Sequence, residues 1–430
     1  MRQLLNKWKT DNYAFIDRIL LFFIASTIPF TLSLGNIAII CSAIFSVLTL
    51  KHRIKSKISY NSIALYLPFI YFIIVLISAI TSNNINSGFR LVDKSLFFIL
   101  IPFIILSFQN TIDIKKTLNV FAYATFFATI ILIFYSTYNA IFYKSIDKLF
   151  FHEFTSLFDQ HPVYFSTYQA LSVFVLTYAS PNKSSEKRLN SIIISLLIIG
   201  VFLSASKAVI FIFIIMYFYQ LFVKYKKNIK RRILIIGFYL SSIVLLLFIP
   251  KVNNRFVEGL HFDLRFKPTN DVAQAQVFKY DDKHLISDLE IRFMFSSIGL
   301  YHFIDDDKLL FGYGVGDVQN YLDYYYMQYG LAPKWYEGYN LHNQYLQILI
   351  SCGLLAFLFF ILYLIYHLKC AIKGKDQLFI MFLIITMFVF LFESSLMRNK
   401  GVVFFVFFSS LFLINTLSNE NWNIRNQGRA

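Results

Sequence analysis

The sequence predicts an all-α polytopic membrane protein, and both its composition and its long apolar segments indicate this class. Of the 430 residues, 57% are hydrophobic and 15% are charged, and the chain holds 51 Phe and 28 Tyr. Soluble domains are about 45–50% apolar and about 25% charged, so the composition excludes a soluble globular, disordered or fibrous protein. The apolar segments are too long for the strands of a membrane barrel, which leaves spanning helices.

Twelve apolar segments are predicted to span the membrane. A hydrocarbon core of about 30 Å takes roughly 20 helical residues, and shorter segments thin the bilayer locally. The first segment is followed at once by a second, so we interpret it as a retained anchor and not as a signal peptide. The predicted spans are residues 16–33, 36–50, 62–80, 88–107, 117–140, 162–180, 191–204, 205–223, 233–250, 344–367, 378–394 and 401–417.

The Lys and Arg residues cluster between alternate spans, which predicts cytoplasmic termini under the positive-inside rule. The net charge of +16 therefore follows from membrane topology, and the expected partners include membrane lipids but no nucleic acid. The clusters on the predicted cytoplasmic side are Lys51/Arg53/Lys55/Lys57, Lys115/Lys116, Lys183/Lys187/Arg188, Lys224/Lys226/Lys227/Lys230/Arg231/Arg232 and Lys369/Lys373/Lys375.

One long loop, residues 251–343, separates the ninth and tenth predicted spans and is expected on the outer face. It divides the chain into helices one to nine (1–250), the loop, and helices ten to twelve with a cytoplasmic tail (344–430). Loops of this length without a role are uncommon. We expect it to be partly helical, to lie over the bundle and to roof a cavity.

Histidines and a second set of cations are predicted on the outer side. Ionisable groups near membrane depth are costly and usually face a cavity or a partner, although single ones are often interfacial anchors. Several cations from separate hairpins suggest an anion site that suits the pyrophosphate of a lipid-linked sugar, which Arg binds through two parallel donors. The residues are His152, His161, His261, His284, His302, His342, Arg90, Lys94, Lys207, Arg292, Arg398 and Lys400.

The loop carries three short motifs. Glu290-Ile291-Arg292-Phe293 opens a predicted amphipathic helix. The alternating glycines of 311–317, with Gly314 and Asp317, fit either a binding loop or a plain turn. His342, just before the tenth span, is a candidate general base, with a structural histidine as the alternative.

No metal or cofactor is predicted. Asp281-Asp282 and Asp305-Asp306-Asp307 could recruit a divalent cation, but consecutive aspartates point in different directions and favour a solvated turn. The three cysteines lie in or beside apolar runs without ligand or disulfide spacing. The chain also lacks a phosphate-binding P-loop and a hydrolase nucleophile motif.

Five motifs occur in an order that resembles the O-antigen ligase and polymerase superfamily of bacterial membrane proteins, over about residues 15–417. The His-Asn block and the Arg and Gly block across one outer loop are the more specific of these. The motifs are Asp159-Gln160-His161-Pro162-Val163-Tyr164, Ser204-Ala205-Ser206-Lys207, Arg292 with Leu309-Leu310-Phe311-Gly312-Tyr313-Gly314-Val315-Gly316-Asp317, His342-Asn343-Gln344-Tyr345-Leu346-Gln347-Ile348-Leu349 followed by Gly353-Leu354-Leu355, and Glu393-Ser394-Ser395-Leu396-Met397-Arg398-Asn399-Lys400-Gly401.

The resemblance implies a metal-independent membrane glycosyltransferase of the C type. Such an enzyme takes a glycan from an undecaprenyl-pyrophosphate carrier on the outer face of the bacterial inner membrane and passes it to an acceptor hydroxyl, without a cofactor. It implies that His342 is the base and that Arg292 holds the leaving group. Lys207 stands where the family often has Arg, which keeps the charge but loses bidentate binding.

Further site residues carry weaker expectations. The cations expected to bind the same pyrophosphate are Lys207, Arg398, Arg90 and Lys400. The side chains and glycine expected as substrate contacts are His161, Tyr164, Gly314, Asp317 and Asn343.

Several functions stay open at this stage. Ligation of O-antigen to the lipid A core is favoured over repeat-unit polymerisation onto a growing glycan and over protein O-glycosylation. A lipid-linked glycan transporter is the next alternative, but the sequence shows no internal repeat and no paired broken helices. A membrane scaffold is disfavoured because so many ionisable residues lie near membrane depth.

Overall fold

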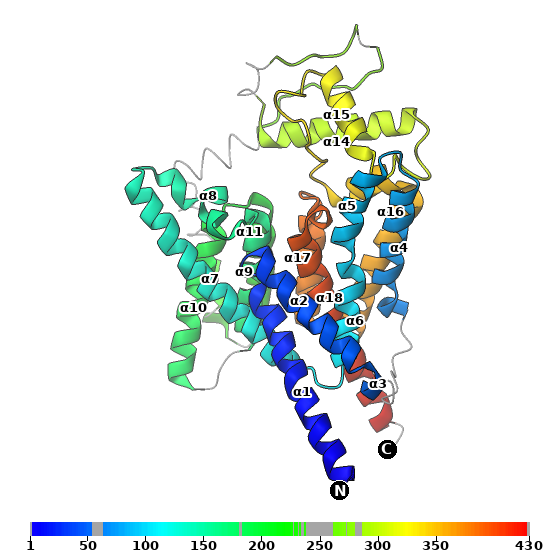
Figure 1. Ribbon diagram of the computed structural model, residues 1–430. Coiled ribbons are helices and arrows are strands. Elements are labelled where there is room, and N and C mark those ends of the chain that lie inside the picture. The colour runs from blue at the N-terminus through cyan, green and yellow to red at the C-terminus, as the bar shows by residue number, and fades with distance from the viewer. Residues whose placement is uncertain are drawn as a thin grey trace.

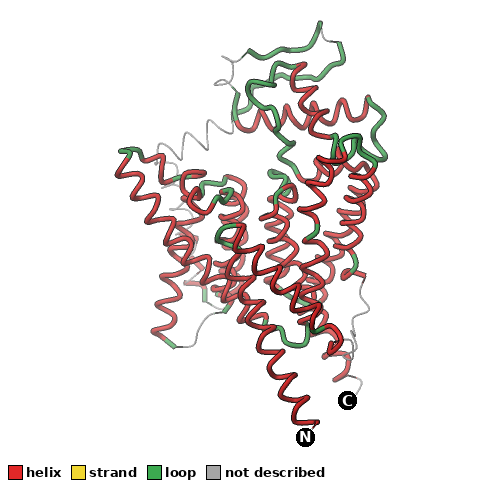
Figure 2. Tube along the Cα trace, viewed as in Figure 1, coloured by secondary structure: helices red, strands yellow, loops and turns green. Residues whose placement is uncertain are grey.

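The computed structural model describes residues 2–53, 63–179, 183–226, 228–230, 232–233, 236–237, 261–271, 273–279 and 286–427. All regular secondary structure within these ranges is helical, as Figure 2 shows, which confirms the predicted all-α class. Most of the predicted span 233–250 lies outside the described residues, as do His284 and Asp281-Asp282.

Helices account for most of the described chain (Figure 1). In chain order they are α1 (Arg2–Thr27), α2 (Leu32–Leu48), α3 (Leu50–Arg53), η1 (Ile63–Leu65), α4 (Leu67–Ile80), α5 (Ile85–Ser95), α6 (Phe97–Phe108), α7 (Ile114–Phe142), η2 (Ile146–Leu149), α8 (Phe151–Thr155), η3 (Ser156–Phe158), α9 (Pro162–Tyr178), α10 (Ser184–Leu203), α11 (Lys207–Lys224), α14 (Asp288–Asp305), α15 (Val318–Gln328), α16 (Gln344–Lys373), α17 (Gln377–Val389), η6 (Ser395–Met397) and α18 (Asn399–Gln427).

Helices coincide with the predicted spans that fall within the described residues. In the part of the chain that the structure describes, five stretches are long and apolar enough to cross a membrane: Ile85–Phe108, Ile114–Phe142, Lys207–Lys224, Gln344–Lys373 and Asn399–Ser418. The apolar helices α2, α4 and α17 are shorter. The chain is therefore a polytopic membrane protein, and the number of twelve spans stays a prediction.

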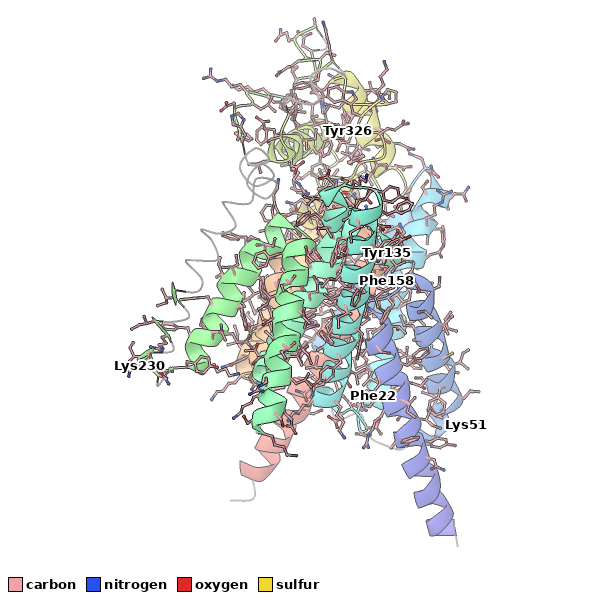
Figure 3. The ribbon with its side chains drawn as sticks, turned by 90° about the vertical axis from the view of Figure 1, so that its left-hand side faces the viewer. Phe22, Lys51, Tyr135, Phe158, Lys230 and Tyr326 are labelled. Atoms are coloured by element: carbon pink, nitrogen blue, oxygen red, sulfur yellow. The ribbon has the colours of Figure 1, made fainter. Side chains whose placement is uncertain are left out.

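The two ends of the bundle differ. The marked N- and C-termini lie at one end, while α14 and α15 lie beyond the other (Figure 1). Lys51 and Lys230, from two predicted cytoplasmic clusters, lie toward the end that carries the termini, and Tyr326 of α15 lies at the opposite end (Figure 3). This separation of the basic clusters from the loop is the one that the sequence predicts.

Helices α9 and α18 form the centre of the bundle. Every residue of α9 from Pro162 to Thr177 is buried, and the first sixteen residues of α18 from Gly401 onward are all buried except Asn415. Phe404 of α18 packs on Tyr168 of α9, with ring centroids 4.7 Å apart. These two helices position the residues at their outer ends, His161 and Lys400, within a rigid frame.

We call the described residues of 261–343, which include α14 and α15, the outer segment. It has a hydrophobic core of its own, separate from that of the bundle. Buried residues of α14 and α15 pack on one another, with the rings of Phe295 and Tyr326 4.7 Å apart. Ser287 and Glu290 form a capping box that starts α14, and Glu290 also accepts the backbone N–H groups of Asp263 and Leu264. These bonds fix the end of α14 that carries Arg292.

Glycines of 312–316 join the outer segment to a kink in α16. Gly353 adopts φ +82° and ψ 178°, which interrupts the helical hydrogen bonds. The N–H groups of Tyr313 and Gly314 donate to the freed carbonyls of Ile350 and Ser351 at 2.9 and 2.8 Å, and Leu354 N donates to Leu309 O at 2.8 Å. These hydrogen bonds join the main chain of residues 309–314 to that of α16, and we call this junction the backbone splice.

Replacing Gly353 by Ala is expected to destabilise the protein. The backbone conformation is one that essentially only Gly adopts and costs another residue about 1–3 kcal/mol. A Cβ would also lie 2.1 Å from the carbonyl oxygen of Leu310. Thermal unfolding in detergent should show a lower Tm for G353A.

Gly35 of α2 provides the matched control, because a Cβ there meets nothing within 4 Å. Gly35→Ala should leave the Tm unchanged or raise it, since Ala favours a helix by up to about 1 kcal/mol over Gly. Equal Tm values for G353A and G35A would contradict the role assigned to the kink.

Candidate functional site

The site is built around the connection between α17 and α18, residues 390–398, which we call the 390–398 connection. It is tied to the first residue of α16, since Gln344 N donates to Phe390 O at 2.8 Å and Leu396 N donates to Gln344 Oε1 at 2.7 Å. Asn343 caps α16 by accepting the N–H groups of Tyr345 and Leu346. These bonds bring the start of α16 against the connection.

His342 and Glu393 meet at this junction. His342 has a left-handed φ of +48°, and its N–H donates to Asn340 Oδ1 at 2.9 Å. The turn directs its imidazole Nδ1 to 3.5 Å from Glu393 Oε2, and the Glu393 side chain is only 1% exposed. The predicted base therefore faces a buried carboxylate.

Arg292 reaches the same junction from α14. Its guanidinium donates to the carbonyl oxygen of Phe392 and lies 3.5 Å from the carbonyl oxygen of His342. Burial lowers the pKa of Arg292, whereas the charges of Glu393 and Asp288 raise it. The guanidinium has five N–H donors, so these carbonyls leave donors for an anion.

His161 lies at the start of α9, close enough to Glu393 for the carboxylate charge to act on its imidazole. Burial lowers the pKa of His161 to about 4, and this outweighs the opposite effect of the Glu393 charge. Its Nδ1, Glu393 Oε1 and Ser394 Oγ are all buried, and none of them has a hydrogen-bond partner among the described residues. Because buried polar atoms normally have partners, this group of atoms indicates a place for a polar ligand or water. The imidazole of His161 and the ring of Tyr164 are 5.3 Å apart.

Three cations gather beside the connection. Arg90 and Lys94 lie one turn apart on α5, and Lys94 Nζ donates to Met397 O at 3.0 Å. The positive charges of Arg90 and Arg398 both act on Lys94, and Arg398 also acts on His161. Arg90 and Arg398 are exposed. Like charges held together in this way suit an anionic ligand.

Lys207 and Lys400 make other bonds. Lys207 Nζ lies 2.9 Å from Asp288 Oδ2, one turn of α14 before Arg292. Lys400 Nζ donates to the carbonyls of Phe158 and Asp159, each at 2.8 Å. Both lysines brace the site, and their predicted role in binding pyrophosphate stays a prediction.

Three predicted substrate contacts have structural partners. Asp317 accepts the N–H groups of Asn83 at 2.6 Å and Asn84 at 2.8 Å, which anchors the start of α5 and so positions Arg90 and Lys94. Gly314 belongs to the backbone splice with α16. Asn343 is the cap of α16. Their contact with substrate remains a prediction.

Glu393 is the residue at this site that was not among the predicted site residues. It lies in the motif Glu393-Ser394-Ser395, where an acid in a mostly apolar stretch is the signal for a functional group at membrane depth. Sequence alone did not show that this acid faces His342, because the two are 51 positions apart. Within the described ranges, no three His, Cys, Asp or Glu side chains are placed to hold a metal ion.

Part of the chain is similar in sequence to a known protein family. The family model for O-Antigen ligase matches residues 192–361. The match confirms the resemblance to the O-antigen ligase superfamily. The matched region contains Lys207, Arg292 and His342, while Glu393 and Arg398 follow it in the sequence. No curated protein matches the chain.

Acidification is expected to destabilise the protein through His161. Its pKa falls from 6.5 to about 4 on folding, so the unfolded chain binds a proton that the folded protein excludes. Stability is therefore complete above pH 6.5 and is lost as the pH falls toward 4, by at most about 3 kcal/mol. His161→Gln should reduce the difference between the Tm values measured at pH 7 and pH 4.5.

His261 is the control for this effect, because its side chain is 60% exposed. His261→Gln should keep the wild-type difference between the two Tm values. A wild-type difference in H161Q as well would show that His161 does not carry this acid sensitivity.

Proposed function

We propose that the protein transfers a glycan from an undecaprenyl-pyrophosphate carrier to an acceptor hydroxyl at the outer face of the bacterial inner membrane. The family match supports glycan transfer of the O-antigen ligase or polymerase type by a membrane glycosyltransferase. The observation that carries the proposal is the convergence of Arg292, from α14, and His342, from the start of α16, on the 390–398 connection.

The reaction we propose is a single displacement. His342 takes the proton of the acceptor hydroxyl, whose oxygen attacks the anomeric carbon of the lipid-linked glycan as the bond from that carbon to the pyrophosphate oxygen breaks. An imidazole suits a base that acts near neutral pH. The electron pair leaves with the pyrophosphate, and attack from the opposite face inverts the anomeric configuration.

Fixed cations stabilise the leaving group in this proposal. Arg292 lies beside the base, and Arg90, Lys94 and Arg398 form a second group at the Met397 end of the 390–398 connection. Preorganised positive charge in a partly buried site stabilises negative charge that develops in the transition state. Such charge makes metal-independent transfer chemically reasonable.

We favour the lipid A core as the acceptor, with a growing glycan as the second candidate. The first corresponds to O-antigen ligation and the second to repeat-unit polymerisation, and protein O-glycosylation and lipid-linked glycan transport follow as further alternatives. In this proposal the termini are cytoplasmic, and the outer segment within 251–343 is periplasmic. The location of Lys51 and Lys230 toward the end of the bundle opposite to Tyr326 of α15 supports that orientation (Figure 3).

A gel of surface lipopolysaccharide from cells with the gene deleted and then restored tests the proposal. A ligase leaves the lipid A core bare while lipid-linked polymer accumulates, and a polymerase leaves a core with a single repeat. An unchanged ladder with altered glycoprotein would indicate protein glycosylation. An unchanged ladder and unchanged glycoprotein would contradict glycan transfer in that cell.

His342→Ala is expected to abolish transfer while donor binding persists, because the base is lost and the cations remain. General bases typically contribute about 10²–10⁴-fold to the rate. Transfer and the binding of a lipid-linked pyrophosphate donor should be measured on the same purified protein. Arg292→Ala is the comparison, and it should weaken donor binding as well as transfer. Normal transfer by H342A would contradict the role of the base.

A further inference from the structure

We infer that Glu393 is a positioning residue for His342: its carboxylate accepts the Nδ1–H of the imidazole and so turns the other ring nitrogen, Nε2, toward the acceptor hydroxyl. The inference rests on the proposed function, because it assigns His342 as the base. The carboxylate and Nδ1 are 3.5 Å apart, slightly longer than a hydrogen bond. Such bonds are often long without substrate and shorten when the substrate binds.

The surroundings of Glu393 favour this role over a structural one. Other buried carboxylates of the site region hold backbone amides: Glu290 accepts those of Asp263 and Leu264, and Asp317 accepts those of Asn83 and Asn84. Within the described part of the chain, neither carboxylate oxygen of Glu393 has a hydrogen-bond partner, and His342 Nδ1 has none either. Burying a carboxylate that makes no hydrogen bond to the backbone costs free energy of folding. This cost indicates a role for Glu393 other than a structural one.

The protein keeps this carboxylate charged. The guanidinium of Arg292 donates to the carbonyl oxygen of Phe392, the residue directly before Glu393, and its positive charge acts on the Glu393 carboxylate. This charge favours the ionised form of the side chain. A permanent negative charge beside Nδ1 selects the ring tautomer with its proton on that nitrogen.

The 390–398 connection holds the carboxylate in place. Gln344 bonds both Phe390 and Leu396, and Arg292 bonds the carbonyl of Phe392, the residue directly before Glu393. The backbone on both sides of Glu393 is thus fixed to α16 and α14, the two elements that carry His342 and Arg292. These contacts therefore set the positions of His342 and Glu393, and no hydrogen bond of the Glu393 side chain is needed for it.

The proton balance of the step is simple. The acceptor O–H bond breaks and its proton moves to Nε2, so His342 becomes an imidazolium while Glu393 stays ionised and stabilises the new positive charge. The proton passes to water after the product leaves. The same division of roles between a histidine and a buried acid occurs in serine hydrolases.

Other charged groups face the pair from each element around it. His161 and Tyr164 belong to the start of α9, and His152 belongs to α8. Asp288 acts through Arg292. The groups that contribute to the local field are His152, His161, Tyr164, Asp288, Arg292 and Arg398.

The test compares Glu393→Gln and Glu393→Asp with the full-length protein in liposomes, using an undecaprenyl-pyrophosphate-linked glycan as donor. E393Q keeps the shape of the side chain but removes its charge, so kcat should fall about 100-fold or more while the donor KM stays within about threefold. E393D should recover part of the lost kcat.

Asp376→Asn is the matched control. Asp376 caps α17 at the opposite end of that helix, where it accepts Phe379 N at 3.0 Å. This variant should keep the wild-type kcat, so a general loss of stability is told apart from loss of the positioning charge. Wild-type kcat in E393Q, or equal kcat values for E393Q and E393D, would overturn the inference.

A second measurement does not depend on transfer. Diethyl pyrocarbonate modifies unprotonated imidazole, and mass spectrometry follows the modification of His342 as a function of pH. Loss of the Glu393 charge disfavours the imidazolium, so the midpoint for His342 should move to lower pH in E393Q and stay unchanged in D376N. An unmoved midpoint in E393Q would overturn the inference.

The two measurements separate the inference from the proposed function. A wild-type protein that transfers no glycan, with a midpoint that moves in E393Q, would contradict the proposed function but support the pair. A wild-type protein that transfers glycan, with E393Q equally active, would support the function and overturn the positioning role.

Discussion

The attachment of the 390–398 connection to the start of α16 is the constraint on which the site depends. Gln344 uses both its backbone N–H and its side-chain oxygen for it, and Arg292 adds a bond from the outer segment. These hydrogen bonds bring together α14, the start of α16 and the 390–398 connection, which lie far apart in the sequence. His342 and Glu393 owe their proximity to the two bonds of Gln344, which substitutions of His342 or Glu393 leave intact.

Electrostatics and burial oppose each other at this junction. Burial alone disfavours the charged forms of Glu393, Arg292 and His161. The carboxylate and the guanidinium offset part of that cost through each other's charge, while His161 is left neutral. The cations Arg90, Lys94 and Arg398 have no comparable anion described for them, and an anionic ligand would complete the balance.

The sequence was sufficient for the all-α membrane class, because hydropathy and charge pattern report directly on the membrane. Its motifs also pointed to His342 and Arg292, which the structure brings together, while their catalytic roles stay predictions. It could not show that Asp317 and Asn343 serve the backbone, since a motif does not reveal which atoms its side chains contact. It also left out Glu393, whose importance lies in a neighbour distant in sequence.

The splice between the glycine motif and the kink of α16 has a mechanical consequence. Residues 309–314 bond to main-chain atoms of α16 on both sides of Gly353, so this part of the outer segment cannot lift away unless those bonds break. Any opening between the outer segment and the bundle then has to occur at helices other than α16. The hydrogen bonds of the splice thus make residues 309–314 and the adjoining part of α16 a single rigid unit.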